Sequence, residues 1–453
     1  MRYLKSCPFL HILLMLTPLL LISPDSLWAQ ARPTFLPVPE GVVELTGFAA
    51  DGGIVEAKDG SLMLIQGGGL FETGQTAPTR RVSTDGGKTW SAPTPLKADM
   101  GAGGVIRLQS GALAMYGTKG KLGGSCHFCT SPDDGQTWTA PVNIGTYTDW
   151  RPMFHSMIQL QSGRIVLVGY WEGLNANPPD AQRYTVTGSG LWRGRWLWME
   201  GHRGVEMGIC IAYYSDDEGK TWSQCKGGLF GWFDERGVPN GEGGILDVYE
   251  PTAAETKDGR VLMFARSKVG RLVQSYSLDR STTWYSILPT ELSSSQSPPM
   301  LVRIPSTGDL LCIWNQVSIE EIQRGFLRGR LSVAISKDSG LTWENFKTLE
   351  RQEGMEDVAR IAPEYPIPRV TRARPGVGQL PDAFAMFSYV NVDIVGDKVF
   401  VRYLRTWAAE EKAGGLAPDP NEMQLLWKQF EQRGAAMTGD HVMRIYPLDW
   451  FYN

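Results

Sequence analysis

One octet of residues recurs five times along this chain and restricts its fold more than any other feature of the sequence. Every copy keeps Ser, Asp, Thr and Trp at positions one, three, seven and eight, and four copies also keep Gly at position five. An Asp carboxylate accepts hydrogen bonds from turn amides and Gly allows a positive φ, so the octet predicts a hairpin turn with Trp packed beneath it. The copies begin at Ser83, Ser131, Ser215, Ser277 and Ser336 and end at Trp90, Trp138, Trp222, Trp284 and Trp343.

A second repeat runs alongside the octets: six apolar segments each enter a tight Gly turn and leave as another apolar segment. This pattern predicts six β-hairpins. A single hairpin cannot bury both its faces, so a chain of recurring hairpins is typical of folds that stack one unit per repeat. We therefore predict an all-β fold, a six-bladed β-propeller with four strands in each blade. The hairpins span 54–65, 105–116, 157–168, 252–265, 301–314 and 390–403.

The remaining segments lie before, between and after the repeats. Residues 1–31 have a positive start, an apolar run over 9–22 and small residues at 29–31, which predicts a secretory signal peptide and a secreted or periplasmic protein. That run is shorter than the ~20 residues of a membrane-spanning helix. Residues 32–453 then form the propeller, and 442–451 should add a strand that closes the ring. Insertions are expected at about 172–207, 345–383 and 408–432, the last of them helical.

Charge and cysteine content exclude several classes of partner and cofactor. The net charge is −4, with both signs dispersed, whereas a nucleic-acid-binding protein needs a basic stripe. No segment after the first thirty residues is long and apolar enough to span a membrane. Five cysteines follow the signal peptide, an odd number, so at least one thiol stays outside an intramolecular disulfide. Cys126 and Cys129 lack a second ligand pair at zinc spacing, so we predict no metal or other cofactor and either a local disulfide or two buried thiols.

Candidate site residues emerge when the hairpins are aligned on their turn glycines. The innermost strand of each blade runs along the central channel, so residues that precede these strands gather at one end of it. Asp51 and Glu250 stand nine positions before the turn Gly in blades one and four, and Arg266 stands seven positions after it. Arg151 and His155 begin the inner strand of blade three. A set of charged groups at strand ends around one channel favours a functional site, because burying charge without a use is costly.

The octet is similar to the Asp-box of sialidases (neuraminidases), and three segments resemble sialidase blades: 249–266, 328–336 and 389–397. The resemblance implies Tyr389 as nucleophile, Glu250 as its base, and Arg266 and Arg328 as parts of a clamp for the sugar carboxylate. A tyrosine suits this chemistry because an anionic nucleophile would be repelled by that carboxylate. The implied activity is a retaining exo-glycosidase that removes a terminal sialic acid or related acidic sugar from a glycan.

The first blade departs from the sialidase pattern. Residues 47–53 contain no arginine where the family supplies the third arginine of the clamp, and 74–78 lack the expected acid/base Asp. Asp51 or Glu72 is a substitute for the acid, and Arg151 is a substitute for the arginine. His155 is either a general acid/base or a residue of the rim.

These departures leave two other functions open, because a fold does not determine a function. One is a lyase or other uronate-processing enzyme, in which arginines neutralise the uronate and His155 or Tyr389 abstracts the C5 proton. The other is a glycan-binding propeller without catalytic activity.

Overall fold

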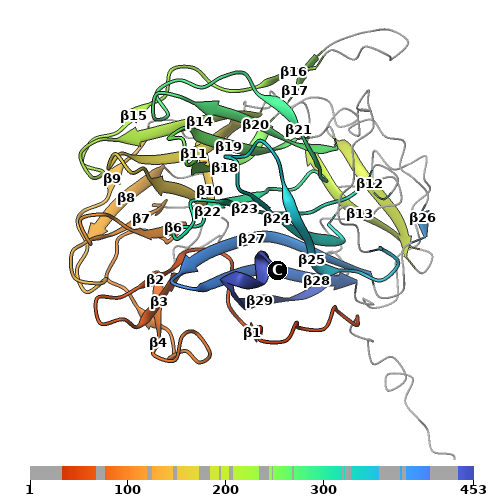
Figure 1. The fold of residues 1–453 in the computed structure, drawn as a ribbon, viewed down its shortest axis with the longest axis horizontal. Helices are drawn as coiled ribbons and strands as arrows, with labels where there is room; N and C mark the ends of the chain where they lie inside the picture. The colour runs from red at the N-terminus through yellow and green to blue at the C-terminus, as the bar shows by residue number, and fades with distance from the viewer. Residues whose placement is uncertain are drawn as a thin grey trace, which may run out of the picture. The chain divides into compact units, whose positions relative to one another are not determined.

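Six four-stranded antiparallel sheets succeed one another around a central axis, as the two repeats predicted (Figure 1). The computed structural model describes residues 33–67, 77–119, 125–145, 150–172, 184–192, 195–203, 208–233, 244–246, 248–267, 270–318, 321, 326, 328–356, 378–379, 384–408 and 437–453. The expected signal peptide at 1–31 lies outside these residues, as does the expected helix at 408–432 apart from Ala408. In the described part of the chain, no helix has the length and apolarity needed to cross a membrane.

Each predicted hairpin supplies the two innermost strands of one blade, and two outer strands complete it. Blade 1 is β2 (Gly53–Glu56), β3 (Leu62–Gln66), β4 (Thr79–Ser83) and β5 (Thr94–Pro95). Blade 2 is β6 (Gly104–Arg107), β7 (Leu113–Thr118), β8 (Cys126–Ser131) and β9 (Val142–Asn143). Blade 3 is β10 (Trp150–Gln159), β11 (Ile165–Glu172), β14 (Gly208–Ser215) and β15 (Ser223–Gln224).

The second half of the ring repeats this arrangement. Blade 4 is β18 (Val248–Glu255), β19 (Val261–Ser267), β20 (Arg271–Ser277) and β21 (Leu288–Ser293). Blade 5 is β22 (Met300–Arg303), β23 (Leu310–Trp314), β24 (Arg330–Ser336) and β25 (Glu344–Arg351). Blade 6 is β27 (Ala385–Val395), β28 (Lys398–Ala408), β29 (Met437–Pro447) and β1 (Val43–Thr46).

The ring is closed by both ends of the propeller chain. β29 contains most of the predicted closing strand and pairs with β28, while the 3-10 helix η5 (Leu448–Phe451) follows it. β1 then pairs antiparallel with β29, Val43 opposite Ile445, and becomes the outermost strand of blade 6 (Figure 1). The sequence predicted the C-terminal strand but not this N-terminal one.

A buried cluster of charged side chains joins β1 to blades 5 and 6. Glu350 of β25 is fully buried and accepts hydrogen bonds from Tyr403 Oη at 2.6 Å and Arg405 Nη1 at 3.3 Å, with Arg444 Nη2 at 2.9 Å. Glu44 of β1 accepts from Arg444 Nε at 2.7 Å and from Arg405 Nη2 at 3.1 Å. Buried charges are tolerated when they are paired and hydrogen-bonded. The cluster therefore ties the closing strand to its neighbours.

All five octets form the predicted hairpin turn with one set of hydrogen bonds. In the first copy, Ser83 Oγ donates to Asp85 Oδ1 at 2.8 Å and accepts from the Gly87 amide at 2.8 Å. Thr89 donates to the same carboxylate through its amide at 2.9 Å and its hydroxyl at 2.6 Å. The other four copies repeat these bonds. The conserved positions of the octet are thus explained by the turn.

These turns predict loss of stability in acid. The hydrogen bonds from Thr137 lower the pKa of Asp133 to about 2, and the pKa of the matching Asp is lowered in the other four octets. A carboxyl whose pKa is depressed by folding stabilises the protein above its ordinary pKa of about 4 and loses that contribution as the pH falls towards 2. We expect the urea midpoint, followed by tryptophan fluorescence, to fall steadily from pH 4 to pH 2. A midpoint that stays constant over this range would contradict the prediction.

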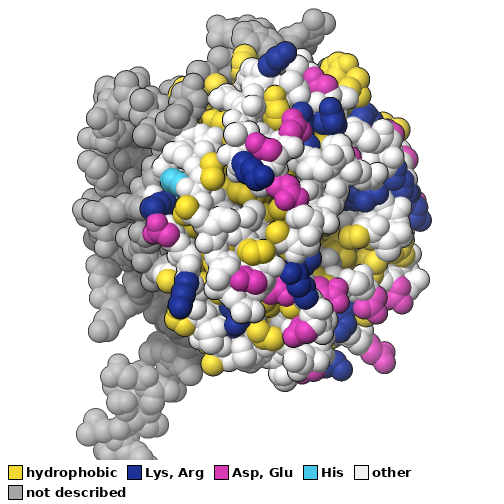
Figure 2. Space-filling view, turned by 90° about the vertical axis from the view of Figure 1, so that its left-hand side faces the viewer, with side chains coloured by type: hydrophobic (Ala, Val, Ile, Leu, Met, Phe, Trp, Pro, Cys, Tyr) yellow, Lys and Arg dark blue, Asp and Glu magenta, His cyan; other side chains and the backbone are white. Residues whose placement is uncertain are grey.

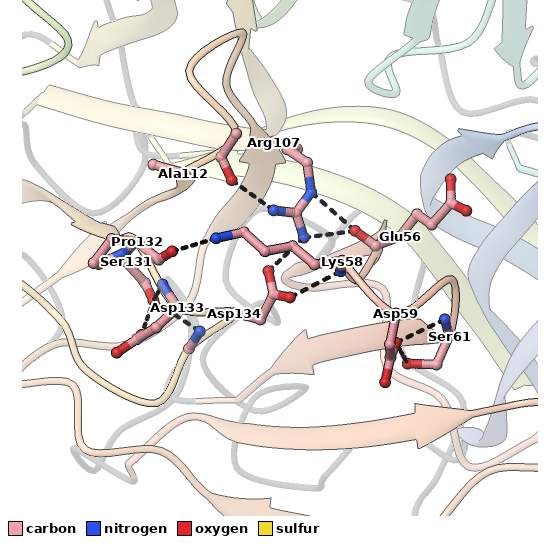
Figure 3. Close-up of polar contacts among 12 residues, drawn as sticks. Glu56, Lys58, Asp59, Ser61, Arg107, Ala112, Ser131, Pro132, Asp133 and Asp134 are labelled. Atoms are coloured by element: carbon pink, nitrogen blue, oxygen red, sulfur yellow. Dashed lines mark hydrogen bonds and ion pairs between the residues drawn. The ribbon is translucent and has the colours of Figure 1, made fainter.

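The octet of blade 2 also fastens that blade to blade 1 (Figure 3). Asp134 accepts the Lys58 amide at 2.8 Å and Arg107 Nη2 at 2.7 Å. Arg107 Nε in turn donates to the Glu56 carbonyl at 2.9 Å. Asp134 has a φ of 55°, so the left-handed turn of the octet aims this carboxylate at the neighbouring hairpin. One short motif therefore builds a turn and joins two blades.

The insertions differ in part from the sequence prediction. β25 extends to Arg351, so the first residues of the expected insertion 345–383 belong to blade 5. Within the expected insertion 172–207, β12 (Tyr184–Trp192) and β13 (Arg195–Arg203) form a hairpin. β26 (Gly378–Gln379) pairs parallel with β12, so these two insertions share one small sheet. A further hairpin, β16 (Gly231–Phe233) with β17 (Gly244–Leu246), precedes blade 4.

The five cysteines of the propeller are all buried thiols in the described structure. Cys126 and Cys129 stand three residues apart on β8 and pack into two different hydrophobic clusters. Of the two alternatives that the sequence left open for this pair, the structure therefore has the buried thiols. Burial raises the pKa of Cys129 to about 12.

Candidate functional site

Glu250 and Tyr389 occupy the same kind of position in two different blades. Glu250 lies in β18 where its register with β19 shifts between Tyr249 and Thr252. Tyr389 lies in β27 where its register with β28 shifts between Ser388 and Asn391. Such β-bulges redirect a side chain away from the regular alternation of a strand, and they are common next to active sites.

Both residues also have a left-handed backbone, with φ of 48° at Glu250 and 54° at Tyr389. This conformation is less stable than the right-handed one by roughly 1–2 kcal/mol for any residue other than Gly. Among the described residues, six other non-glycine positions share it, and five of those belong to octet turns, where the geometry requires it. Inside a strand it has no such explanation. Strain of this kind persists at sites where the surrounding fold holds a side chain in place for a function. The six are Asp134, Glu218, Arg280, Ser281, Ser339 and Asn345.

The two residues line one small cavity, and the two predicted arginines contact them. Arg266 Nη1 lies 2.7 Å from Glu250 Oε2, and both side chains are buried. The guanidinium of Arg328, also buried, lies 5.1 Å from the centroid of the Tyr389 ring, which is cation–π geometry. The structure therefore brings together Glu250 and Arg266, from the paired strands β18 and β19, with Arg328 and Tyr389 from later in the chain. The other cavity residues are Pro251, Pro298, Pro299, Met300 and Val390.

The wall formed by Pro298, Pro299 and Met300 was not predicted from the sequence. Pro299 stands nine positions before Gly308, the turn glycine of blade 5. Asp51 and Glu250 stand at the same distance before the turn glycines of blades 1 and 4. The offset therefore marks Pro299 as well, but an uncharged proline gives no chemical sign of a site.

Asp51 lies at the seam between blades 1 and 6. It is buried, and its Oδ2 accepts a hydrogen bond from the Gly67 amide at 2.8 Å. Arg402 of blade 6 donates to the Asp51 carbonyl at 2.6 Å, and Asn391 donates to the carbonyl of Ala50. Asn391 follows Tyr389 by two residues, so the seam places Asp51 beside the segment that carries the predicted nucleophile.

For the other two predicted site residues, Arg151 and His155, the structure describes the backbone but not the side chain. Arg151 stands opposite Tyr170 in the pairing of β10 with β11, and His155 falls in the irregular stretch of β10 between Pro152 and Met157. Their side chains lie outside the described part of the structure, as does Glu72. The roles predicted for Arg151, as a substitute for the missing clamp arginine, and for His155, as a general acid/base or a residue of the rim, therefore stay predictions.

A second, larger cavity of about 600 Å³ lies on the axis and is lined by the inner strands of all six blades. Its lining comes from the ends of these strands, close to the hairpin turns, whereas Glu250 and Tyr389 stand nearer to the beginnings of theirs. Of the predicted site residues whose side chains the structure describes, namely Asp51, Glu250, Arg266, Arg328 and Tyr389, none lines it. Its polar lining residues include Glu56, Arg107, Gln159, Glu255, Arg303 and Asp393.

Charged side chains of both signs are mixed on the face drawn in Figure 2. Lys and Arg side chains are interspersed there with Asp and Glu, and hydrophobic side chains are scattered between them. Among the described residues, no group of three or more His, Cys, Asp or Glu is arranged to hold a metal ion.

Comparison with known protein families matches residues 109–380 to the BNR repeat-like domain and residues 81–92, the first octet, to the BNR/Asp-box repeat. The longer match covers more than half of the chain. The chain belongs to the BNR repeat-like family. The resemblance to Asp-box proteins predicted from the octets is thereby confirmed, and the six blades agree with it. No curated protein sequence matches the chain.

Solved structures with a similar chain path include a protein of unknown function from Dyadobacter fermentans DSM 18053. It is 13% identical, the match covers 90% of this chain and 99% of that one, and the TM-score is 0.48. The Hadza microbial sialidase Hz136 is 16% identical over 78% of this chain and 62% of that one, TM-score 0.46. Trypanosoma rangeli sialidase in complex with the inhibitor DANA is 12% identical. The match covers 89% of this chain and 55% of that one, and the TM-score is 0.45. This chain thus spans less than two thirds of both sialidases.

The contacts around the cavity of this BNR repeat-like protein define what chemistry the site can perform. A guanidinium has five N–H donors, so Arg266 can hold Glu250 through one and still bind an anion through others. Arg328 contributes a second positive charge against the Tyr389 ring. A carboxylate, a phenol and two guanidiniums in one buried setting suit the binding of an anionic group and proton transfer beside it.

Proposed function

We propose that this protein is a retaining exo-glycosidase that hydrolyses the bond to a terminal acidic sugar, sialic acid or a close relative, at the end of a glycan. The observation that carries the proposal is that Glu250 and Tyr389 line the same cavity. Each stands at a β-bulge inside a strand and has a left-handed backbone. Their contacts with Arg266 and Arg328 supply the positive charge that such a sugar requires. The predicted signal peptide further suggests that the enzyme acts outside the cytoplasm.

In the proposed reaction, Arg266 and Arg328 bind the sugar carboxylate and hold the anomeric carbon at Tyr389. Tyr389 Oη attacks that carbon while its proton passes to Glu250, and the bond to the leaving oxygen breaks. A general acid must protonate that oxygen, and we assign this role to Asp51, which flanks blade 6. Water then attacks the glycosyl–tyrosine intermediate, Asp51 takes the proton from the water, and Glu250 returns its proton to the phenolate.

The test is a substrate screen on the purified protein. It is incubated with simple sialosides and with uronic-acid polysaccharides, while free sugar is followed by reducing-end detection and unsaturated product by ultraviolet absorbance. We expect free acidic sugar from sialosides or related glycans and no absorbing product. Absorbing product from a uronate polymer would show the lyase instead. Retention of the glycans without any product would show a binding protein.

A further inference from the structure

A buried asparagine stands in blade 5 at the place that Arg266 has in blade 4. Asn315 comes directly after β23 and seven positions after the turn glycine Gly308, just as Arg266 stands seven positions after Gly259. Its side chain is buried. The alignment of the blades therefore places Asn315 at the end of the channel where the predicted site residues gather.

The side-chain amide of Asn315 joins segments of two blades. Its Nδ2 donates to the carbonyl of Arg330, the first residue of β24, and to the carbonyl of Phe387 in β27, both at 2.9 Å. The Phe387 amide donates in turn to the Arg328 carbonyl at 2.9 Å. Both backbone groups of Phe387 are therefore bonded to blade 5 or to the segment that leads into β24.

These three hydrogen bonds lie next to the two residues that contact each other in the site. Arg328 supplies one of the carbonyls, and Tyr389 follows Phe387 by two residues. The Arg328 guanidinium lies 5.1 Å from the centroid of the Tyr389 ring. Tyr389 has its left-handed backbone at the register shift that begins after Ser388. Such a conformation persists only where the surrounding structure holds it, and the bonds to Phe387 hold the strand just before the shift.

We propose that Asn315 is a positioning residue, which sets the placement of Arg328 against Tyr389 by joining the two segments that carry them. This inference rests on the function proposed above and adds one residue to the support of that site. Asn315 does not line the cavity, and both N–H donors of its amide are used on the two carbonyls. It therefore acts on the sugar through Arg328 and Tyr389.

The test removes the amide with Asn315→Leu, which has a similar volume, and with Asn315→Ala as a second variant that leaves room for water. Either change leaves two buried carbonyls without this donor, so β27 can move relative to blade 5. For the sialoside that responds in the screen, kcat/KM should fall about tenfold to a hundredfold, with a clear fall in kcat, because a displacement of about 1 Å at a site can cost 10²-fold in rate.

Coupling to Arg328 distinguishes positioning from a general loss of stability. Arg328→Lys alone should lower kcat/KM, because a lysine does not reproduce the planar, paired donors of a guanidinium. If Asn315 acts by placing that guanidinium, the variant with both Asn315→Leu and Arg328→Lys should lose clearly less than the product of the two single losses, since residues that serve one interaction are not additive. Losses that multiply in full would mark Asn315 as merely structural.

Asn345→Leu is the matched control. Asn345 lies in β25, and its Nδ2 donates to the Tyr452 carbonyl at 3.1 Å, near the C-terminus. Its φ is 54°, a conformation that leucine adopts only at a cost. This control should lower the urea midpoint, as the Asn315 variants should, but leave kcat and KM unchanged.

The two proposals fail in different ways. If the unaltered enzyme cleaves a sialoside and both Asn315 variants keep its kcat and KM, the role of Asn315 is overturned and the proposed function stands. A fall in kcat of the same size in Asn345→Leu would also overturn it, because the loss would then follow stability alone. If the unaltered enzyme cleaves no acidic-sugar substrate, the proposed function is overturned, and the role of Asn315 with it.

Discussion

Tyr389→Phe is expected to reduce kcat on a responsive acidic-sugar substrate by roughly 10³-fold or more, while the protein stays folded. The substitution removes only the hydroxyl, which in the proposed mechanism forms the covalent bond to the sugar, and loss of a nucleophile is among the costliest changes to an enzyme. The ring is retained, so its contact with Arg328 persists in a slightly altered form. Steady-state kinetics and urea unfolding of the same preparation would measure both effects.

Tyr285→Phe provides the matched control. Tyr285 is half exposed and stacks on Tyr276, with ring centroids 4.7 Å apart, far along the chain from the cavity residues of blade 6. Its hydroxyl has no place in the proposed chemistry, so activity should be unaffected. Equal activity of the Tyr389→Phe enzyme and the unaltered enzyme would remove Tyr389 as the nucleophile and with it the sialidase-type mechanism.

Glu350→Gln is expected to lower the free energy of unfolding by about 3–5 kcal/mol, the usual cost of removing one partner from a buried ion pair. Glu350 is fully buried and contacts Tyr403, Arg405 and Arg444. The neutral amide would leave the two buried guanidiniums with Glu44 and, for Arg405, the more distant Asp440 at 3.9 Å. Because natural domains are stabilised by only about 5–15 kcal/mol, this single change should shift the urea midpoint strongly.

The same substitution at Glu344 separates burial from charge. Glu344 lies on the same strand, and its carboxylate pairs with Lys337 at 2.6 Å, but both side chains are about half exposed. Exposed pairs of this kind contribute up to about 1 kcal/mol. Glu344→Gln should therefore change the urea midpoint little. Similar shifts for the two variants would show that the buried cluster does not hold the ring closed.

Local pattern made the blades predictable. The octet and the Gly turn each specify a hairpin through residues that stand within a few positions of one another, and six hairpins of this kind have no other way to bury their faces than by stacking. Aligning the turn glycines also placed Glu250 and Arg266 correctly at one end of blade 4, because strand register counts residues and needs no knowledge of the neighbouring blade.

The features that needed the tertiary structure are those that depend on partners remote in the sequence. β1 completes blade 6 through Glu44 and Arg444, which are separated by 400 positions, and no local signal marks a four-residue strand as a closing one. The left-handed φ of Glu250 and Tyr389 is imposed on residue types that avoid it, so composition could not reveal it. The sequence alone therefore determined the propeller and its six blades, because those follow from short-range repeats, whereas closure of the ring and the geometry of the site were decided by contacts between blades.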